Sequence, residues 1–143
     1  MLQTGKTAAL AAVAVIASSA HAGVIGFRES FINDTASAFA QADLVICRAG
    51  ASTVTEIAAV GAAAIFVPFP FAVDDHQTTN ARFLVEQGGG WLLPQAELTA
   101  QSLAGRLQQL TRAELLACAQ KAHQQRQTNA TREVVVACEE LAA

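Results

Sequence analysis

The 143-residue sequence lacks the features that mark several specialised classes of protein. Nine Lys and Arg against twelve Asp and Glu give a net charge of -3, and no basic stretch is interleaved with aromatic residues, which argues against a nucleic-acid partner. No apolar run reaches the roughly 18 residues that a membrane span needs. Internal repeats and Pro/Ser-rich linkers are also missing, so we expect a single domain over residues 1–143.

Cysteine is scarce, with Cys47, Cys118 and Cys138 as the only three. The number is odd and no C-x-x-C pair occurs, so we expect buried free thiols in a reducing compartment. A hydrophobic content of 52% with 15% charged residues indicates one folded domain with a substantial core rather than a disordered chain.

Residues 43–80 form the most informative stretch, which reads as strand, turn, helix, strand and loop. Leu44–Cys47 and residues 63–69 are apolar runs of the kind that form strands buried on both faces. Between them, Thr53 and Glu56 have the spacing of a capping box, and Gly61 is placed to end the helix. The pattern predicts a βαβ unit and an α/β fold.

The turn of this unit is a candidate anion site. Ala49, Gly50 and Ala51 leave the backbone almost bare, and the free N–H groups of a helix start would favour a phosphate. The turn carries neither a Walker loop nor a G-x-G-x-x-G fingerprint. Arg48 is either a positive charge near a diphosphate or a solvated residue at a strand end. Glu56 is either a capping residue or a carboxylate for ribose hydroxyls.

The loop Asp74-Asp75-His76-Gln77 has the residue types of a metal site but not the arrangement. Adjacent aspartates point in different directions on an extended chain, and one neighbouring histidine does not complete a ligand set. We therefore expect no metal and no other cofactor.

Two segments carry a resemblance to a known family. CRAGASTVTEIAAVG (residues 47–61) and VPFPFAVDDHQTTNA (residues 67–81) resemble the C-terminal, donor-binding domain of the MurG family of bacterial glycosyltransferases. The resemblance implies a Rossmann-like parallel sheet flanked by helices, as one half of a GT-B enzyme. The implied reaction transfers N-acetylglucosamine from UDP-GlcNAc to the lipid-linked muramyl-pentapeptide of peptidoglycan synthesis, with a helix N-terminus instead of a metal stabilising the leaving UDP.

The resemblance also implies a set of residues that bind UDP-GlcNAc. Ile32 would contact the uracil through its backbone, Glu56 would hold the ribose, and Gln77 would bind hydroxyls of the sugar through its amide. The whole set is Ile32, Ala51, Ser52, Thr53, Val54, Thr55, Glu56 and Gln77, with Arg48, His76 and Asn80 as further candidates.

The sequence also departs from the family pattern. The acceptor-binding domain with its candidate base and the G-G-S-x-G-A loop are not found in it, so we expect an incomplete donor-binding domain that does not catalyse alone. The lipid-linked acceptor would be bound by a missing domain or a partner chain. Two alternatives stay open: a non-catalytic donor-binding subunit of a split glycosyltransferase, or a truncated, inactive gene product.

The N-terminal residues allow two interpretations. Lys6, the apolar stretch that follows it and Ala20-His21-Ala22 fit a secretory signal at residues 1–22. The alternative, which we favour, is an alanine-rich buried helix over residues 7–19 followed by a strand from Val24–Phe27. The second interpretation and the resemblance imply a cytoplasmic protein, peripheral at the cytoplasmic face of the inner membrane.

The remaining elements are predicted from caps and periodicity. Asn33 or Asp34 can cap a short helix that runs through Ala42. A helix over residues 77–87 with Ala81, Phe83, Leu84 and Val85 on its apolar side ends at three glycines, and residues 91–93 form a strand. Three further helices are expected over residues 99–110, 112–125 and 130–141.

Overall fold

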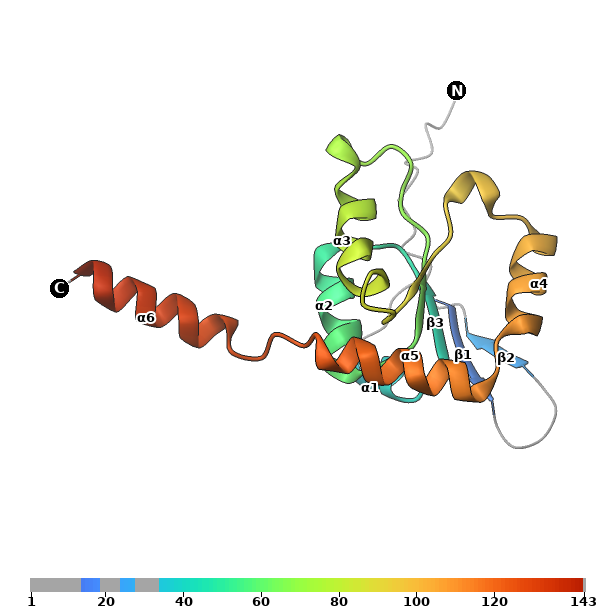
Figure 1. Cartoon of the computed structure of the whole chain (residues 1–143), viewed down its shortest axis with the longest axis horizontal. Helices are drawn as coiled ribbons and strands as arrows, with labels where there is room; N and C mark the ends of the chain where they lie inside the picture. The colour runs from blue at the N-terminus through green and yellow to red at the C-terminus, as the bar shows by residue number, and fades with distance from the viewer. Residues whose placement is uncertain (1–13, 19–23, 28–33, 143) are drawn as a thin grey trace, which may run out of the picture.

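The computed structural model describes residues 14–18, 24–27 and 34–142, and it confirms the expected α/β class (Figure 1). A five-stranded sheet lies in the middle of the molecule and helices cover both of its faces. In chain order the elements are β1 (Ala14–Ser18), β2 (Val24–Phe27), α1 (Thr35–Ala40), β3 (Leu44–Cys47), α2 (Ala51–Val60), β4 (Ala64–Phe66), η1 (Val73–Asp75), α3 (His76–Val85), β5 (Trp91–Leu92), η2 (Gln95–Glu97), α4 (Ala100–Gln109), α5 (Arg112–Gln124) and α6 (Ala130–Ala142).

The sheet has the strand order β2-β1-β3-β4-β5, and its β3, β4 and β5 strands are parallel. Cys47 pairs with Phe66, and Phe66 pairs with Leu92, so these three strands end level with one another. The βαβ unit read from residues 43–80 is therefore confirmed. Because the strands end together, the segments that follow them meet along one edge of the sheet.

The first two strands correct the expectation for the N-terminal part of the chain. Residues 14–18 lie in strand β1, which pairs antiparallel with both β2 and β3, so the helix predicted over residues 7–19 is wrong there. Val15 and Ile16 are β-branched and favour a strand, and β3 offers them a row of backbone partners. The strand predicted from Val24–Phe27 is confirmed, and residues 1–13 and 19–22 of the signal-like segment lie outside the described residues.

Alternate residues of the parallel strands pack into two separate cores. Val45, Cys47, Ala64 and Phe66 join the core beneath α1, α2 and α3, whereas Leu44, Ile65 and Val67 join the core that α4 and α5 cover. This alternation follows from the two-residue period of a strand. Helices on both faces explain why both apolar runs lack polar positions.

Strand β4 is shorter than the apolar run that predicted it. It spans Ala64–Phe66 instead of residues 63–69, although Val67 and Pro68 are also buried. Pro68 has no N–H to continue the ladder, and the N–H of Phe69 donates to a side chain instead of a strand.

Helix α2 has its N-cap three residues earlier than the predicted capping box, at Gly50 instead of Thr53. Gly50 is the N-cap and makes no side-chain capping bond, so Thr53 and Glu56 lie inside the helix and the capping-box interpretation is wrong. A turn of three residues after β3 is sufficient to bring the helix back onto the sheet. Gly61 ends the helix as predicted, with a φ of 76° and its N–H donating to the Ile57 carbonyl at 2.9 Å.

The other helices begin and end within a few residues of their predicted limits. Asp34 caps α1, accepting from the Ser37 hydroxyl at 2.6 Å and from the Ser37 N–H at 3.0 Å, but α1 ends at Ala40 rather than Ala42. Helix α3 spans His76–Val85 and buries Ala81 and Leu84, whereas Phe83, predicted on the apolar side, is exposed. The helices predicted over residues 99–110, 112–125 and 130–141 are confirmed as α4, α5 and α6.

Helix α6 extends away from the rest of the chain (Figure 1). It carries Cys138, which is exposed, so the expectation of three buried thiols holds only for Cys47 and Cys118. Within residues 14–18, 24–27 and 34–142, the helices are too short or too polar to cross a membrane.

Candidate functional site

The candidate residues gather at the edge of the sheet where β3 and β4 end. Strand β3 leads through residues 48–50 into α2, and β4 leads through residues 67–75 into α3. The two links are held together, since the Val67 N–H donates to the Cys47 carbonyl at 2.8 Å and the Asn80 Nδ2 donates to the Ala49 carbonyl at 3.1 Å. The sequence predicted both segments, and the fold brings them side by side.

The start of α2 is open. The first intrahelical bond runs from the Val54 N–H to the Gly50 carbonyl at 3.0 Å, which leaves the N–H groups of Ala51, Ser52 and Thr53 without a partner inside the helix. No side chain caps them and no acidic residue occupies the first turn. Among the described residues, a Cβ added to Gly50 would have only the Thr53 Oγ1 within 4 Å, at 3.8 Å, so the backbone is accessible there. Together with the helix dipole, this geometry favours an anion.

The side chains of α2 divide into ones that face the core and ones that are available to a ligand. Val54 is 4% exposed and packs in the core, and Thr55 Oγ1 donates to the Ala51 carbonyl at 2.9 Å. Ser52 is exposed and Thr53 is half-buried. Glu56 is half-buried, and among the described residues no hydrogen bond or ion pair holds its carboxylate. Glu56 is therefore available to bind hydroxyl groups near the start of the helix.

Arg48 differs from the solvated strand-end residue that was one of its two interpretations from the sequence. It is half-buried, and its Nη1 donates to the carbonyls of Val67 at 3.1 Å and Pro68 at 3.0 Å. Its guanidinium carbon lies 5.5 Å from the centre of the Phe69 ring. The strand-end interpretation is wrong because these carbonyls, which follow β4, lie within reach of a side chain that follows β3.

The start of α3 supplies polar side chains at the same edge. The Gln77 Oε1 accepts a hydrogen bond from the Phe69 N–H at 2.9 Å, and Gln77 and Asn80 are both half-buried. His76 is exposed. Asp74 and Asp75 precede the helix with φ values of 55° and 50°, and the Thr78 hydroxyl donates to the Asp75 carboxylate at 2.7 Å. The described residues include no cluster of three or more side chains suited to a metal ion. Ile32 lies outside the described residues.

The sequence predicted the polar residues of the candidate site but not how they contact one another. The Val67 and Pro68 carbonyls lie 19 and 20 residues after Arg48 in the sequence, and no sequence pattern predicts a contact at that separation. Phe69, which belonged to an apolar run, takes part through its backbone N–H and its ring. The one available signal was the position of both segments directly after parallel strands, which predicts proximity but not partners.

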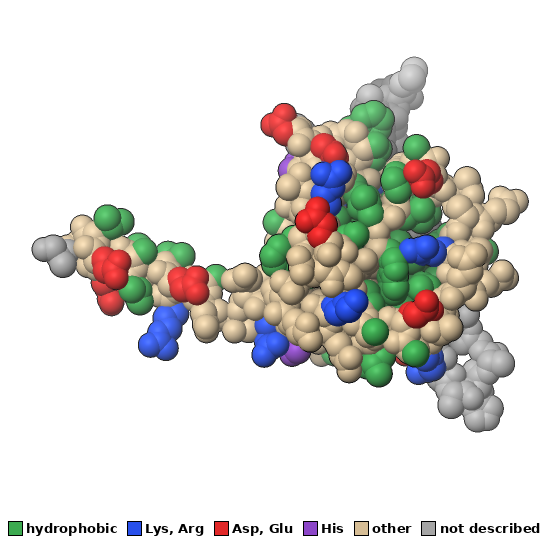
Figure 2. Space-filling view, in the orientation of Figure 1, with side chains coloured by type: hydrophobic (Ala, Val, Ile, Leu, Met, Phe, Trp, Pro, Cys, Tyr) green, Lys and Arg blue, Asp and Glu red, His purple; other side chains and the backbone are tan. Residues whose placement is uncertain are grey.

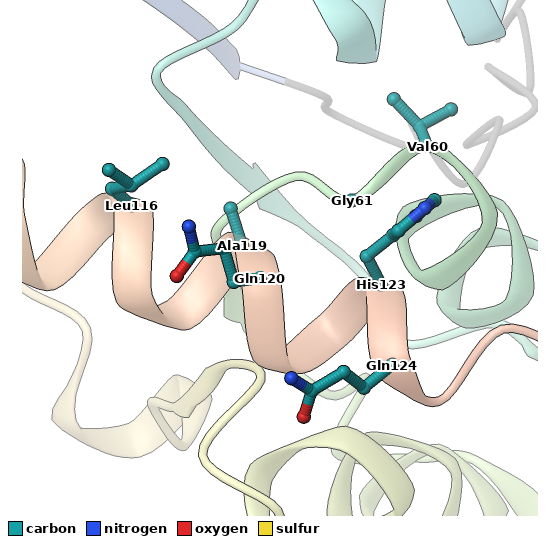
Figure 3. A pocket seen from close by; sticks show the side chains of 7 residues that line it. All are labelled: Val60, Gly61, Leu116, Ala119, Gln120, His123 and Gln124. Carbon is teal, nitrogen blue, oxygen red and sulfur yellow. The ribbon is translucent and has the colours of Figure 1, made fainter.

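A hollow of about 450 Å³ lies at the other end of α2 and is separate from the candidate site (Figure 3). Figure 3 shows His123 of α5 directed toward Val60 and Gly61, at the point where the chain enters β4. Ligands of open parallel sheets bind at the edge where the strands end, and this hollow lies where β4 begins. The hollow is lined by Val60, Gly61, Leu116, Ala119, Gln120, His123 and Gln124.

Comparison with known proteins gives concordant matches. Residues 1–137 match the family model described as "Glycosyltransferase family 28 C-terminal domain". Two relatives are each named UDP-N-acetylglucosamine--N-acetylmuramyl-(pentapeptide) pyrophosphoryl-undecaprenol N-acetylglucosamine transferase. The one from Acidovorax sp. (strain JS42) is 68% identical over 125 residues, which is 87% of this chain and 31% of the relative. The one from Polaromonas sp. (strain JS666 / ATCC BAA-500) is 68% identical over 126 residues, or 88% of this chain and 33% of the relative.

The fold is similar to that of a solved structure. The crystal structure of Acinetobacter baumannii MurG matches with a TM-score of 0.73 and 49% sequence identity, over 77% of this chain and 32% of the crystallised one. The chain thus spans about a third of the length of the proteins it matches.

Proposed function

The chain belongs to the glycosyltransferase family 28 C-terminal domain family, and on this premise we propose that it binds UDP-N-acetylglucosamine at the start of α2. The bound donor would supply N-acetylglucosamine for transfer to a lipid-linked muramyl-pentapeptide. The observation that carries the proposal is the open N-terminus of α2, which is capped by Gly50 alone and follows a turn that Asn80 of α3 contacts.

The diphosphate occupies the helix start. The free N–H groups of Ala51, Ser52 and Thr53 supply donors, and the helix dipole adds a positive potential. The same groups stabilise the negative charge that develops on UDP as the bond to the sugar breaks, without a metal ion. Ser52 adds an exposed hydroxyl, and the turn is bare enough for close approach.

The nucleoside lies along α2. Glu56 is one turn further into the helix, and its carboxylate can accept hydrogen bonds from both ribose hydroxyls. Val54 is buried, and the Thr55 hydroxyl already donates to a carbonyl. These two residues would therefore contribute to the site through the helix backbone and not through their side chains. Contact of the uracil with the backbone of Ile32 stays a prediction from the resemblance.

The sugar lies toward α3. Gln77 and Asn80 both lie on α3. Gln77 accepts a hydrogen bond from the segment that follows β4, and Asn80 donates one to the segment that follows β3. A half-buried amide beside the diphosphate can bind sugar hydroxyls, and His76 lies next to it on the exposed side. This arrangement favours a UDP-linked hexosamine as the donor.

The acceptor would be bound by another domain or a partner chain. Helix α6 presents Val134, Val135 and Leu141 to solvent, and Figure 2 shows hydrophobic side chains along it between charged ones. A helix that exposes apolar residues away from its own core favours contact with a further protein surface. Because the proposed acceptor is a membrane lipid, the reaction would take place at a membrane surface, which the resemblance implies is the cytoplasmic face of the inner membrane.

Glu56→Gln in the purified chain tests the proposed site. If Glu56 holds the ribose, the change weakens UDP binding by about 1–3 kcal/mol, the loss expected for charge-assisted hydrogen bonds, while fold stability stays nearly unchanged. Calorimetric titration of UDP measures the dissociation constant, and urea unfolding measures the stability. The matched control is Glu86→Gln, which removes the same charge from an exposed residue at the far end of α3.

The two possible failures are distinguishable. Equal UDP affinities for the wild type and Glu56→Gln would remove Glu56 from the site but leave the rest of the proposal standing. A wild-type chain that binds neither UDP nor UDP-GlcNAc would contradict the proposed function itself.

A further inference from the structure

We infer that Arg48 is a positioning residue for the donor sugar, because it fixes the segment after β4 that orients the Gln77 amide. The inference rests on the proposed function for its ligand, while its structural part concerns contacts within the chain alone. It assigns Arg48 a role other than binding the diphosphate.

Arg48 contacts the segment after β4. One guanidinium nitrogen, Nη1, donates to two successive carbonyls, those of Val67 and Pro68, at 3.1 and 3.0 Å. The same planar group lies 5.5 Å from the Phe69 ring centre, and the rings of Phe69 and Phe71 are 5.7 Å apart at 72°. A single side chain thus holds three consecutive residues, a task that suits a planar guanidinium better than an ammonium.

A hydrogen bond links Phe69 to Gln77. A backbone N–H can only donate, so the atom of Gln77 that faces the Phe69 N–H at 2.9 Å is the oxygen Oε1. The oxygen is therefore engaged inside the chain, and the NH2 group is left as the donor for a ligand. The Gln77 amide would therefore bind the sugar as a donor only.

Part of the Arg48 guanidinium is engaged inside the chain. Both N–H groups of its Nη1 donate to carbonyls and its charge lies partly buried against an aromatic ring, which leaves the N–H groups of Nη2 and Nε for a ligand. Loss of Arg48 should therefore free the Phe69 segment and misorient the Gln77 amide. Recognition of the sugar would suffer, whereas recognition of UDP at the α2 start would not.

Hydrogen exchange in the chain without ligand tests the structural part. In Arg48→Met, the Phe69 amide should exchange about tenfold faster than in the wild type, since the segment that carries this N–H is no longer held in place against Gln77. The amide of Val45, which donates to Ala63 in the sheet, should be unchanged and reports an intact fold. The matched control, Arg82→Met, removes an exposed arginine of α3 and should leave both amides unchanged. Unaltered exchange at Phe69 in Arg48→Met would overturn the inference whatever the chain binds.

Ligand titration tests the functional part. Arg48→Met should lower the affinity for UDP-GlcNAc about tenfold, the factor that corresponds to one well-placed hydrogen bond, and leave the affinity for UDP unchanged. Gln77→Ala should have the same effect, and the double variant should lose no more than either single one, because both remove one interaction. Equal losses for UDP and UDP-GlcNAc, or additive losses in the double variant, would overturn the inference.

A second variant covers the case in which Arg48→Met does not fold. Arg48→Lys keeps the positive charge but cannot hold two carbonyls and a ring with one planar group, so the loss should again be specific to the sugar. A Lys variant with wild-type affinity for UDP-GlcNAc would show that charge alone matters and would contradict the positioning role. If the wild type binds no nucleotide, the proposed function fails and the exchange experiment alone decides the role of Arg48 within the fold.

Discussion

The three cysteines have different surroundings, and their reactivity should follow from them. Cys47 lies in the core beneath α2 and Cys118 in the core beneath α5, whereas Cys138 is exposed on α6. Burial raises the pKa of the Cys47 thiol to about 12, and burial also raises the pKa of Cys118. Since the thiolate is the reactive form, both buried groups are protected by low ionisation as well as by poor access.

Brief treatment of the folded chain with iodoacetamide at pH 8 should therefore modify Cys138 alone. Peptide mass spectrometry identifies the modified residue, and the same treatment in denaturant should modify all three thiols. Cys138→Ser should leave the folded chain unmodified. Modification of Cys47 in the folded wild type, at a rate similar to Cys138, would contradict the burial described here.

At the same scale, the sequence predicted a set of candidate site residues but not their partners. Gln77 and Glu56 were named through the resemblance and lie in α3 and α2, the helices that follow β4 and β3, and their roles stay predictions. The assignments for Arg48 and for the capping box failed for a common reason. Each depended on where another segment lies in space, and local spacing carries no information about that.

Among the elements, the three glycines after α3 show how packing restricts the residue types that a position allows. Gly88 has a φ of 72°, which favours glycine, but Gly89 and Gly90 are glycines for lack of space. A Cβ on Gly89 would lie 2.9 Å from the backbone of Ala122 in α5, and one on Gly90 would lie 2.7 Å from the Phe66 ring. The turn thus packs closely between α5 and strand β4 of the sheet.

Gly89→Ala should destabilise the chain by about 1–3 kcal/mol, because the α5 backbone must move to admit the methyl group. Urea unfolding gives the change in the free energy of unfolding. The control is Gly105→Ala in α4, where an added Cβ would meet no atom within 4 Å. There the substitution should stabilise by up to about 1 kcal/mol, since alanine is the better helix former. Equal stability of Gly89→Ala and the wild type would contradict the close packing of this turn.

Elements with a clear period or clear caps were predicted well. Strand β3 and helices α4, α5 and α6 lie within two residues of their expected limits, and Thr99 and Thr111 begin their helices with capping boxes. The N-terminal segment was predicted poorly over residues 14–18, because the alanines there favour a helix whereas Val15 and Ile16 favour a strand. Pairing with β3 decided between them, and that pairing is not local.

In the molecule as a whole, the proposed donor site and the hollow at Gly61 lie at opposite ends of α2. The site uses the helix start, where N–H groups are free, while the hollow lies where α2 ends at Gly61 and β4 begins. Helix α6 projects from the body and leaves its apolar residues exposed. The proposed donor site thus lies at one edge of the sheet, and the exposed apolar residues of α6 lie away from it.

The most direct test of donor binding at the start of α2 is an NMR titration of the isotope-labelled chain with UDP-GlcNAc. We predict saturable shifts at the amides of Ala51, Ser52 and Thr53, and at the side-chain NH2 of Gln77. UDP should reproduce the shifts at α2 but not those at Gln77. Absence of saturable binding, or shifts confined to Gly61, Leu116 and His123 around the hollow, would contradict the account.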